Sequence, residues 1–327
     1  MPLAEPLTGT PPDASARRIR WQYADHWRAP SPRGPVNQFA SRREMDRFVQ
    51  QISAVGLRGL GVFAWNLGAI TALFGSLQHY QRFLVERGLE KIVDLFWCLP
   101  QASPGLSIHD RAHHETIYRM LERFVRMADG LGVENLVVMP AHAYRDTEPV
   151  DPSRIECLAE LWNRVGRMAS DHGLRLGCHH EFWCGIRSQA EIDAFYAATD
   201  PAHVHLFIDT AQHVIAGVDP VALYHRYHER VCGFHFKDTR HVDPGGDFRA
   251  LPDPELVAAT TPRWFHEMGT PGGRVDFPAL MHALKQHGYT GWIGVEHDKA
   301  DIGGGSYAES TALAMWYARQ VLEPIYC

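Results

Sequence analysis

The sequence lacks several patterns that mark common protein classes. None of its six cysteines forms a CxxC pair, so neither a cysteine-based zinc site nor a disulfide framework is expected, and the thiols should be reduced. No apolar run has the length of a membrane-spanning helix, and the first 18 residues lack the apolar core of a signal peptide. These absences predict a cytoplasmic protein with no membrane partner.

Positive charge is also not in excess. The formal net charge is -6 and the isoelectric point is about 6.4, which gives no electrostatic reason to expect a nucleic-acid partner. No GxGxxG motif follows the first predicted strand, which disfavours a dinucleotide-binding fold. No glycine-rich phosphate cradle is evident either, and this favours an unphosphorylated substrate.

Short apolar runs alternate with helical patterns along the chain. Eight runs have the length of buried strands: about 19–27, 57–65, 91–100, 134–140, 174–182, 203–212, 231–239 and 291–298. Helical patterns separate them, and short connections between strand and helix imply parallel pairing. Eight such units predict a single-domain α/β fold, a (β/α)8 TIM barrel over residues 19–327, with residues 1–18 as an irregular tail.

One long irregular stretch interrupts this alternation. Residues 240–275 contain the segments DPGGD, PDPEL and MGTPGGR and follow the seventh predicted strand. Loops of this length in compact domains are usually functional or disordered. Since the loops that follow barrel strands surround the active site, we expect this stretch to lie over the catalytic face.

Polar side chains stand at the ends of the last four predicted strands, where barrels of this type carry their chemistry. They are His179 and Glu181, then Asp209, then His235 and Lys237, and finally Glu296. Carboxylates and imidazoles gathered around one axis would repel or lose hydration unless a cation balanced them. We therefore predict one divalent metal ion: Mn²⁺ first, because the ligands are rich in oxygen, and Mg²⁺, Co²⁺, Fe²⁺ or Zn²⁺ as alternatives.

Three segments carry a resemblance to a known family. IDTAQHVIAGVDPVAL, VCGFHFKDTR and GGRVDFPALMHALKQHGYTGWIGVEHD resemble the xylose-isomerase-like barrels, which include sugar phosphate isomerases and epimerases, and most of all the inosose dehydratase branch. The resemblance extends over about residues 19–322. It implies a Glu–Asp–His–Glu metal shell from strands five to eight, in which Asp209, His235 and Glu296 match the last three ligands.

Two residues are candidates for the first metal ligand, the one contributed by the fifth strand. His179 and Glu181 share one face of the fifth strand because side chains alternate. We favour Glu181 as the ligand and His179 as the base, but by its spacing to Asp209 His179 lies nearer the usual ligand position, so the roles could be exchanged. Related sequences carry a histidine three positions after the aspartate, where this chain has Gln212.

The implied shell suggests a reaction class. A metal that chelates adjacent substrate oxygens polarises a carbonyl and stabilises an enediolate. We expect a metal-dependent lyase, isomerase or epimerase that acts on a keto-sugar or keto-cyclitol in the manner of inosose dehydratase. The candidates for acid–base catalysis are His179, Lys237 and Glu296. The candidates for substrate contact are Gln212, Trp65, Trp183 and Arg240.

Three other functions compete with this expectation. The first is the catalytic α subunit of a C-glycoside deglycosidase, which would eliminate an aromatic aglycone from a 3-keto-C-glycoside and bind a small β subunit. The second is a barrel that binds metal or sugar without catalysis. The third, a nuclease similar to endonuclease IV, is disfavoured by the negative charge. In the leading case we expect a homo-oligomer.

Overall fold

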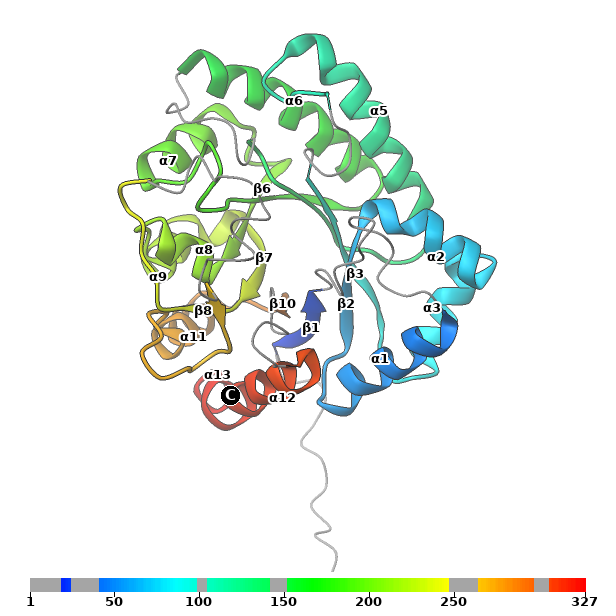
Figure 1. Cartoon of the computed structure of the whole chain (residues 1–327). Helices are drawn as coiled ribbons and strands as arrows, with labels where there is room; N and C mark the ends of the chain where they lie inside the picture. Colours follow the sequence, from blue (N-terminus) through cyan, green and yellow to red (C-terminus); the bar gives the residue numbers. More distant parts are fainter. Residues whose placement is uncertain (1–18, 25–40, 99–104, 142–151, 247–263, 297–305) are drawn as a thin grey trace, which may run out of the picture.

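The computed structural model describes residues 19–24, 41–98, 105–141, 152–246, 264–296 and 306–327. Eight parallel strands close into a barrel in the order β1-β10-β7-β6-β5-β4-β3-β2, seen along its axis in Figure 1. They are β1 (Arg20–Ala24), β2 (Gly59–Phe63), β3 (Lys91–Trp97), β4 (Asn135–Val138), β5 (Arg175–His179), β6 (Val204–Asp209), β7 (Val231–Phe236) and β10 (Trp292–Val295). The predicted (β/α)8 barrel is confirmed.

Helices surround the barrel (Figure 1). They are α1 (Arg42–Ala54), α2 (Leu67–Phe74), α3 (Leu77–Val85), α5 (Arg111–Met127), α6 (Pro152–Asp171), α7 (Gln189–Ala198), α8 (Thr210–Ile215), α9 (Pro220–Tyr227), α11 (Phe277–Gln286), α12 (Tyr307–Tyr317) and α13 (Glu323–Tyr326). Side-chain caps fix several of their starts: Ser41 accepts from Glu44 N, and Ser188 forms a capping box with Glu191. Within the described ranges, no helix is long and apolar enough to cross a membrane.

Two features near the strand ends differ from the predicted pattern. Helix α8 was not predicted: it begins directly after β6, and Asp209 caps it by accepting from Gln212 N. Within the stretch predicted to be irregular, β9 (Phe265–His266) pairs antiparallel with β8 (Asp238–Thr239), which lies directly before that stretch. Residues 247–263 of that stretch and the predicted tail, 1–18, lie outside the described residues.

An apolar layer inside the barrel supports the strand ends. Phe96 and Phe207 belong to a buried cluster and contact the rings of His179 and His235, with centroids 5.4 Å apart for Phe96–His179 and 4.7 Å for Phe207–His235. Gly233 leaves room for Phe207, since a Cβ there would lie 2.4 Å from the ring. The two imidazoles therefore rest on a close-packed aromatic floor.

A polar trio is buried between β1, β3 and β4. Asp94 accepts hydrogen bonds from the side-chain amides of Gln22 and Asn135, the latter at 2.7 Å. Burial raises the pKa of Asp94 to about 6, although the hydrogen bonds from Asn135 and Gln22 lower it. In the part of the chain that the structure describes, the amide oxygens of Gln22 and Asn135 have no hydrogen-bond partner.

We predict that Asp94→Asn stabilises the protein more at neutral than at acidic pH. Stability from protonated Asp94 is complete below its ordinary pKa of 3.8 and is lost as the pH rises through about 6. In the variant, the Gln22 amide can turn over and accept from the new Asn. Urea unfolding at about pH 4.5 and pH 7.5 should show a gain over wild type that is larger at the higher pH by about 2 kcal/mol. A gain or loss that does not change with pH would contradict this account.

Candidate metal centre

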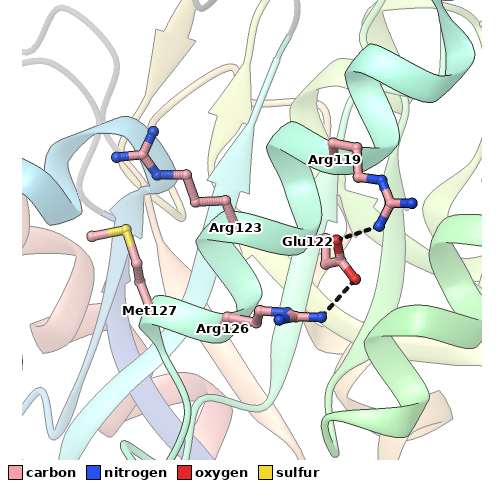
Figure 2. Close-up of a pocket in the computed structure, with 5 residues that line it drawn as sticks. All are labelled: Arg119, Glu122, Arg123, Arg126 and Met127. Carbon is pink, nitrogen blue, oxygen red and sulfur yellow. Dashed lines mark hydrogen bonds and ion pairs between the residues drawn. The ribbon is translucent and has the colours of Figure 1, made fainter.

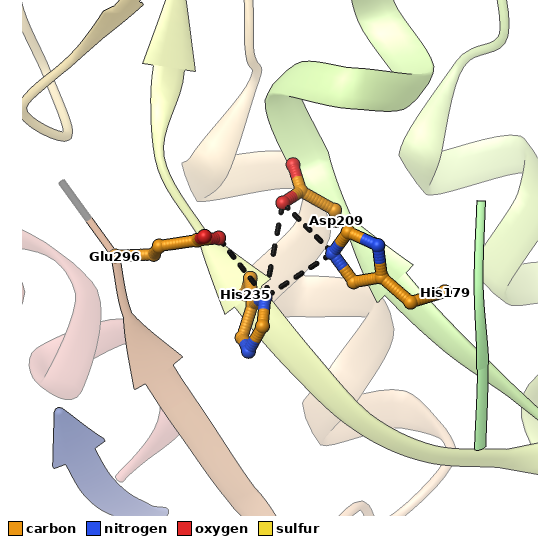
Figure 3. Close-up of side chains that lie close together, drawn as sticks. All are labelled: His179, Asp209, His235 and Glu296. Carbon is orange, nitrogen blue, oxygen red and sulfur yellow. Dashed lines mark hydrogen bonds and ion pairs between the residues drawn. The ribbon is translucent and has the colours of Figure 1, made fainter. Parts of the chain in front are cut away.

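Four buried side chains converge at the carboxyl ends of neighbouring strands (Figure 3). His179 ends β5, Asp209 ends β6, His235 lies near the end of β7, and Glu296 directly follows β10. The pairing register places Asp209 opposite His235. All four are at most 2% exposed, and each offers a ligand atom within 4.8 Å of the others. The closed barrel thus brings together residues up to 117 positions apart, since 296 minus 179 is 117.

The spacing of these atoms fits a divalent cation. His179 Nε2 lies 3.2 Å from Asp209 Oδ2 and 3.2 Å from His235 Nδ1. His235 Nδ1 lies 2.9 Å from a Glu296 oxygen and 3.8 Å from Asp209 Oδ2. Ligands with bonds of about 2.0–2.2 Å to one ion are roughly 3–4 Å apart. Two imidazole nitrogens and two carboxylate oxygens, turned towards one another, are therefore a plausible set of metal ligands.

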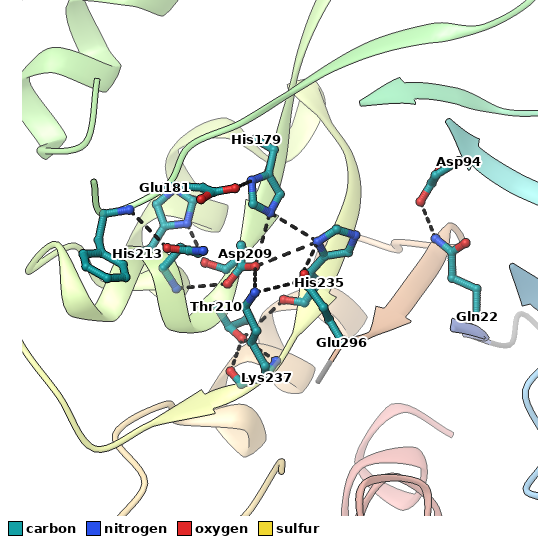
Figure 4. A network of polar contacts seen from close by, with 12 residues as sticks. Gln22, Asp94, His179, Glu181, Asp209, Thr210, His213, His235, Lys237 and Glu296 are labelled. Carbon is teal, nitrogen blue, oxygen red and sulfur yellow. Dashed lines mark hydrogen bonds and ion pairs between the residues drawn. The ribbon is translucent and has the colours of Figure 1, made fainter. Parts of the chain in front are cut away.

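Lys237 supplies a positive charge to this cluster (Figure 4). Its Nζ lies 3.0 Å from Asp209 Oδ2 and 2.7 Å from Glu296 Oε2, and the side chain is 1% exposed. The same Nζ lies 4.2 Å from the centre of the Phe265 ring. Burial raises the pKa of Asp209, but the Lys237 ammonium and the hydrogen bond from His179 outweigh it, so that the pKa is lowered. Asp209 is therefore ionised at neutral pH.

His179 and Glu181 occupy different places at the end of β5. His179 turns Nε2 towards Asp209 and Nδ1 towards Glu181, whose Oε1 is 3.7 Å away. The cluster of four potential ligands contains His179 and not Glu181. This geometry favours the exchanged roles, with His179 as ligand and Glu181 beside the far nitrogen of its ring. His179 Nδ1 has no hydrogen-bond partner among the described residues, and a carboxylate that came within hydrogen-bond distance of it would fix the tautomer and orientation of a ligating imidazole.

The four residues predicted to contact the substrate differ in their burial and in the residues that they contact. Gln212 is buried, and its Oε1 accepts from Phe182 N at 3.1 Å, so this oxygen supports the loop after β5. Trp65 and Trp183 are half-buried and pack against the apolar cluster inside the barrel. Arg240 is exposed, and its carbonyl accepts from Arg274 Nε at 3.0 Å. Only the two tryptophans adjoin the aromatic layer beneath the imidazoles.

Two supporting residues were missed in the sequence. Thr210 donates from its hydroxyl to the Lys237 carbonyl at 2.6 Å and accepts from Lys237 N at 3.1 Å, which fixes the backbone of the lysine. The position of Thr210, directly after Asp209 in the sequence, could have indicated that it supports the site. Phe265 covers the Lys237 ammonium, but its position depends on the pairing of β8 with β9. No periodic pattern could have indicated that contact.

A hollow on the outer surface of α5 is unrelated to this centre (Figure 2). It is lined by Arg119, Glu122, Arg123, Arg126 and Met127. Arg119 and Arg126 each lie 3.0 Å from a Glu122 oxygen, and both arginines are more than 60% exposed. Such solvated pairs contribute little to stability or binding, so the hollow is not a candidate active site.

We predict that Lys237→Met destabilises the metal-free protein by about 3–5 kcal/mol, because it leaves two buried carboxylates without their ammonium. Urea unfolding in the presence of a chelator would measure the loss, and added Mn²⁺ should stabilise the variant more than the wild type. The matched control is Lys285→Met, since Lys285 is exposed and, among the described residues, donates only to the backbone oxygens of Ile325 and Cys327. Equal losses for the two variants would show that the Lys237 charge is not required.

Comparisons with known proteins agree with this architecture. The family model described as xylose isomerase-like TIM barrel matches residues 49–317. Inosose dehydratase from Lacticaseibacillus casei is 29% identical over 188 residues, a match that covers 57% of this chain and 61% of that protein. The chain thus matches less than two thirds of that relative's length.

Two solved structures share the fold at low sequence identity. One is a sugar phosphate isomerase/epimerase from Parabacteroides distasonis, with a TM-score of 0.66, 16% identity and coverage of 99% of this chain and 100% of that chain. The other is described as the IOLI protein with a binding zinc atom, with a TM-score of 0.62, 14% identity and coverage of 88% and 93%. Taken with the family match over residues 49–317, the chain belongs to the xylose isomerase-like TIM barrel family.

Proposed function

We propose that the protein is a metal-dependent lyase or isomerase/epimerase that removes a proton next to the carbonyl of a keto-sugar or keto-cyclitol. The observation that carries the proposal is the buried cluster of two imidazoles and two carboxylates at the catalytic end of the barrel. The similarity to an inosose dehydratase supports a substrate of this class. It does not favour the C-glycoside deglycosidase alternative.

The proposed metal ligands are His179, Asp209, His235 and Glu296. A divalent ion held there would act as a Lewis acid that polarises a substrate carbonyl. Imidazole ligands suit Zn²⁺ and Fe²⁺, whereas carboxylates suit Mn²⁺ and Mg²⁺. Mn²⁺ is the first ion to test, and Zn²⁺ the second, because a structure with the same fold is described with a zinc atom.

Proton transfer then falls to the groups beside the ligands. If His179 is a ligand, Glu181 is the proposed base, since it is 8% exposed and more accessible than the four cluster residues. Lys237 is the proposed acid: its ammonium already lies between Asp209 and Glu296 and could protonate a departing or re-forming oxygen. The same pair of groups serves elimination of a hydroxyl and migration of a proton, so the first step is common to both reactions.

The test is exchange of substrate protons in heavy water. With Mn²⁺ present, we expect deuterium to enter an inosose or a related keto-sugar next to its carbonyl, with or without net reaction, as followed by NMR. Glu296→Gln should weaken metal binding by about tenfold or more and reduce exchange in proportion. The matched control is Glu309→Gln, a change in the exposed first turn of α12, which should leave both unchanged.

Two outcomes would overturn the proposal. Retention of full exchange by Glu296→Gln would show that the reacting site lies elsewhere. Absence of exchange for every substrate, in protein shown to contain one equivalent of metal, would exclude carbon–hydrogen cleavage and favour a barrel that only binds its ligand.

A further inference from the structure

A second cluster of charges lies at the opposite end of the barrel, where the strands begin. Glu134, directly before β4, contacts three cationic side chains that stand at strand starts. Lys91 Nζ lies 2.8 Å from its carboxylate, Arg175 NH2 3.3 Å and Arg20 NH2 3.5 Å. Trp292 Nε1 also donates to this carboxylate at 2.9 Å. We refer to Arg20, Lys91, Glu134 and Arg175 as the N-terminal pole.

The charges of the N-terminal pole do not balance. Burial raises the pKa of Glu134, but the hydrogen bonds from Lys91 and Trp292 outweigh it, so that the pKa is lowered and the carboxylate stays ionised. One negative charge therefore faces three positive charges, an excess of two. Three cations within 3.5 Å of one carboxylate also lie close to one another, and their mutual repulsion is reduced when an anion joins them.

Among the described residues, two further titratable groups are influenced by the charges of the pole, His205 and Asp94, and they do not remove this excess. Burial and, to a smaller extent, the charge of Arg175 lower the pKa of His205, at the start of β6, to about 4, so this ring is neutral at neutral pH. Its Nδ1 is buried and has no hydrogen-bond partner among the described residues. Asp94, inside the barrel, is also influenced by the charges of Glu134 and Arg175. Even with Asp94 ionised, one positive charge remains in excess.

The cations of the pole are accessible but not fully solvated. The exposed fractions of the side chains are 39% for Arg20, 40% for Arg175 and 23% for Lys91. Arg20 is further held over the Trp292 ring, 4.5 Å from its centroid. Partial burial leaves charges less screened by water than those of fully exposed pairs, so an incoming anion would find fixed, incompletely hydrated donors.

We propose that the N-terminal pole binds a small doubly charged oxyanion such as inorganic phosphate or a phosphate monoester. Guanidinium groups donate to such oxyanions in pairs, and a lysine adds a point charge. The net charge of the whole chain is -6, so general attraction does not account for anion binding here. The site lies at the other end of the strands from His179 and Glu296, so it stands independently of the proposed reaction.

The experiment measures phosphate binding to the chelator-treated, full-length protein, so that no metal at the catalytic end can take up the anion. Isothermal titration with phosphate should show one saturable site, and the melting temperature should rise by about 2 °C at roughly ten times the Kd. Arg20→Gln and Arg175→Gln should each weaken binding at least fivefold. Arg126→Gln, in an exposed pair on α5, is the control and should bind as the wild type does.

Glu134→Gln separates an anion site from a purely structural ion-pair network. It is nearly isosteric and removes the only carboxylate of the pole, so we expect phosphate to bind at least fivefold more tightly. If the cluster is only structural, this variant loses stability and gains no affinity. Phosphate can also stabilise proteins by exclusion from their surface; a rise in melting temperature that never saturates and is equal in all variants would overturn the proposal.

Discussion

At the carboxyl ends of the barrel strands, Asp209 and Glu296 share one ammonium, that of Lys237, and all three side chains are buried. Buried carboxylates are tolerated only when a cation and hydrogen bonds replace their hydration. The arrangement of the surrounding residues follows from this need. Thr210 holds the lysine backbone in place, and Phe265 covers the ammonium from the side of the β8–β9 pair.

Small residues and aromatic rings in the strands give these charges their geometry. A Cβ at Gly294 would lie 2.9 Å from the ring of His235, and one at Gly177 would lie 3.3 Å from Phe207. The missing side chains let Phe207 and His235 turn inwards as a layer. Interior packing has little free volume, so these rings cannot be moved without a cost. The position of each imidazole is therefore set by apolar packing below it as much as by the polar groups around it.

The fold could be predicted from the sequence because it depends on periodicity. Periodicity also placed Asp209, His235 and Glu296 at strand ends, and the family resemblance implied that they are metal ligands. Eight apolar runs separated by helical patterns define the barrel, and a closed barrel brings the ends of its strands together. The assignment at β5 could not be predicted. Alternation puts His179 and Glu181 on one face, and only the side-chain rotation turns His179 Nε2 towards Asp209. Helix α8 was missed for another reason: it has six residues, which are too few to show a helical pattern.

The two ends of the barrel carry unbalanced charges of opposite sign. At the carboxyl ends of the strands, Lys237 pairs with Asp209 and Glu296, and Glu181 lies beside His179, so that among these described residues three carboxylates accompany one ammonium. At the starts of the strands, Glu134 faces three cations, which leaves two positive charges before the buried Asp94 is considered. Parallel strands make this separation possible, because every strand start lies at one end and every strand finish at the other. The remaining charge at each end indicates the ligand class that would balance it: a divalent cation at one and an oxyanion at the other.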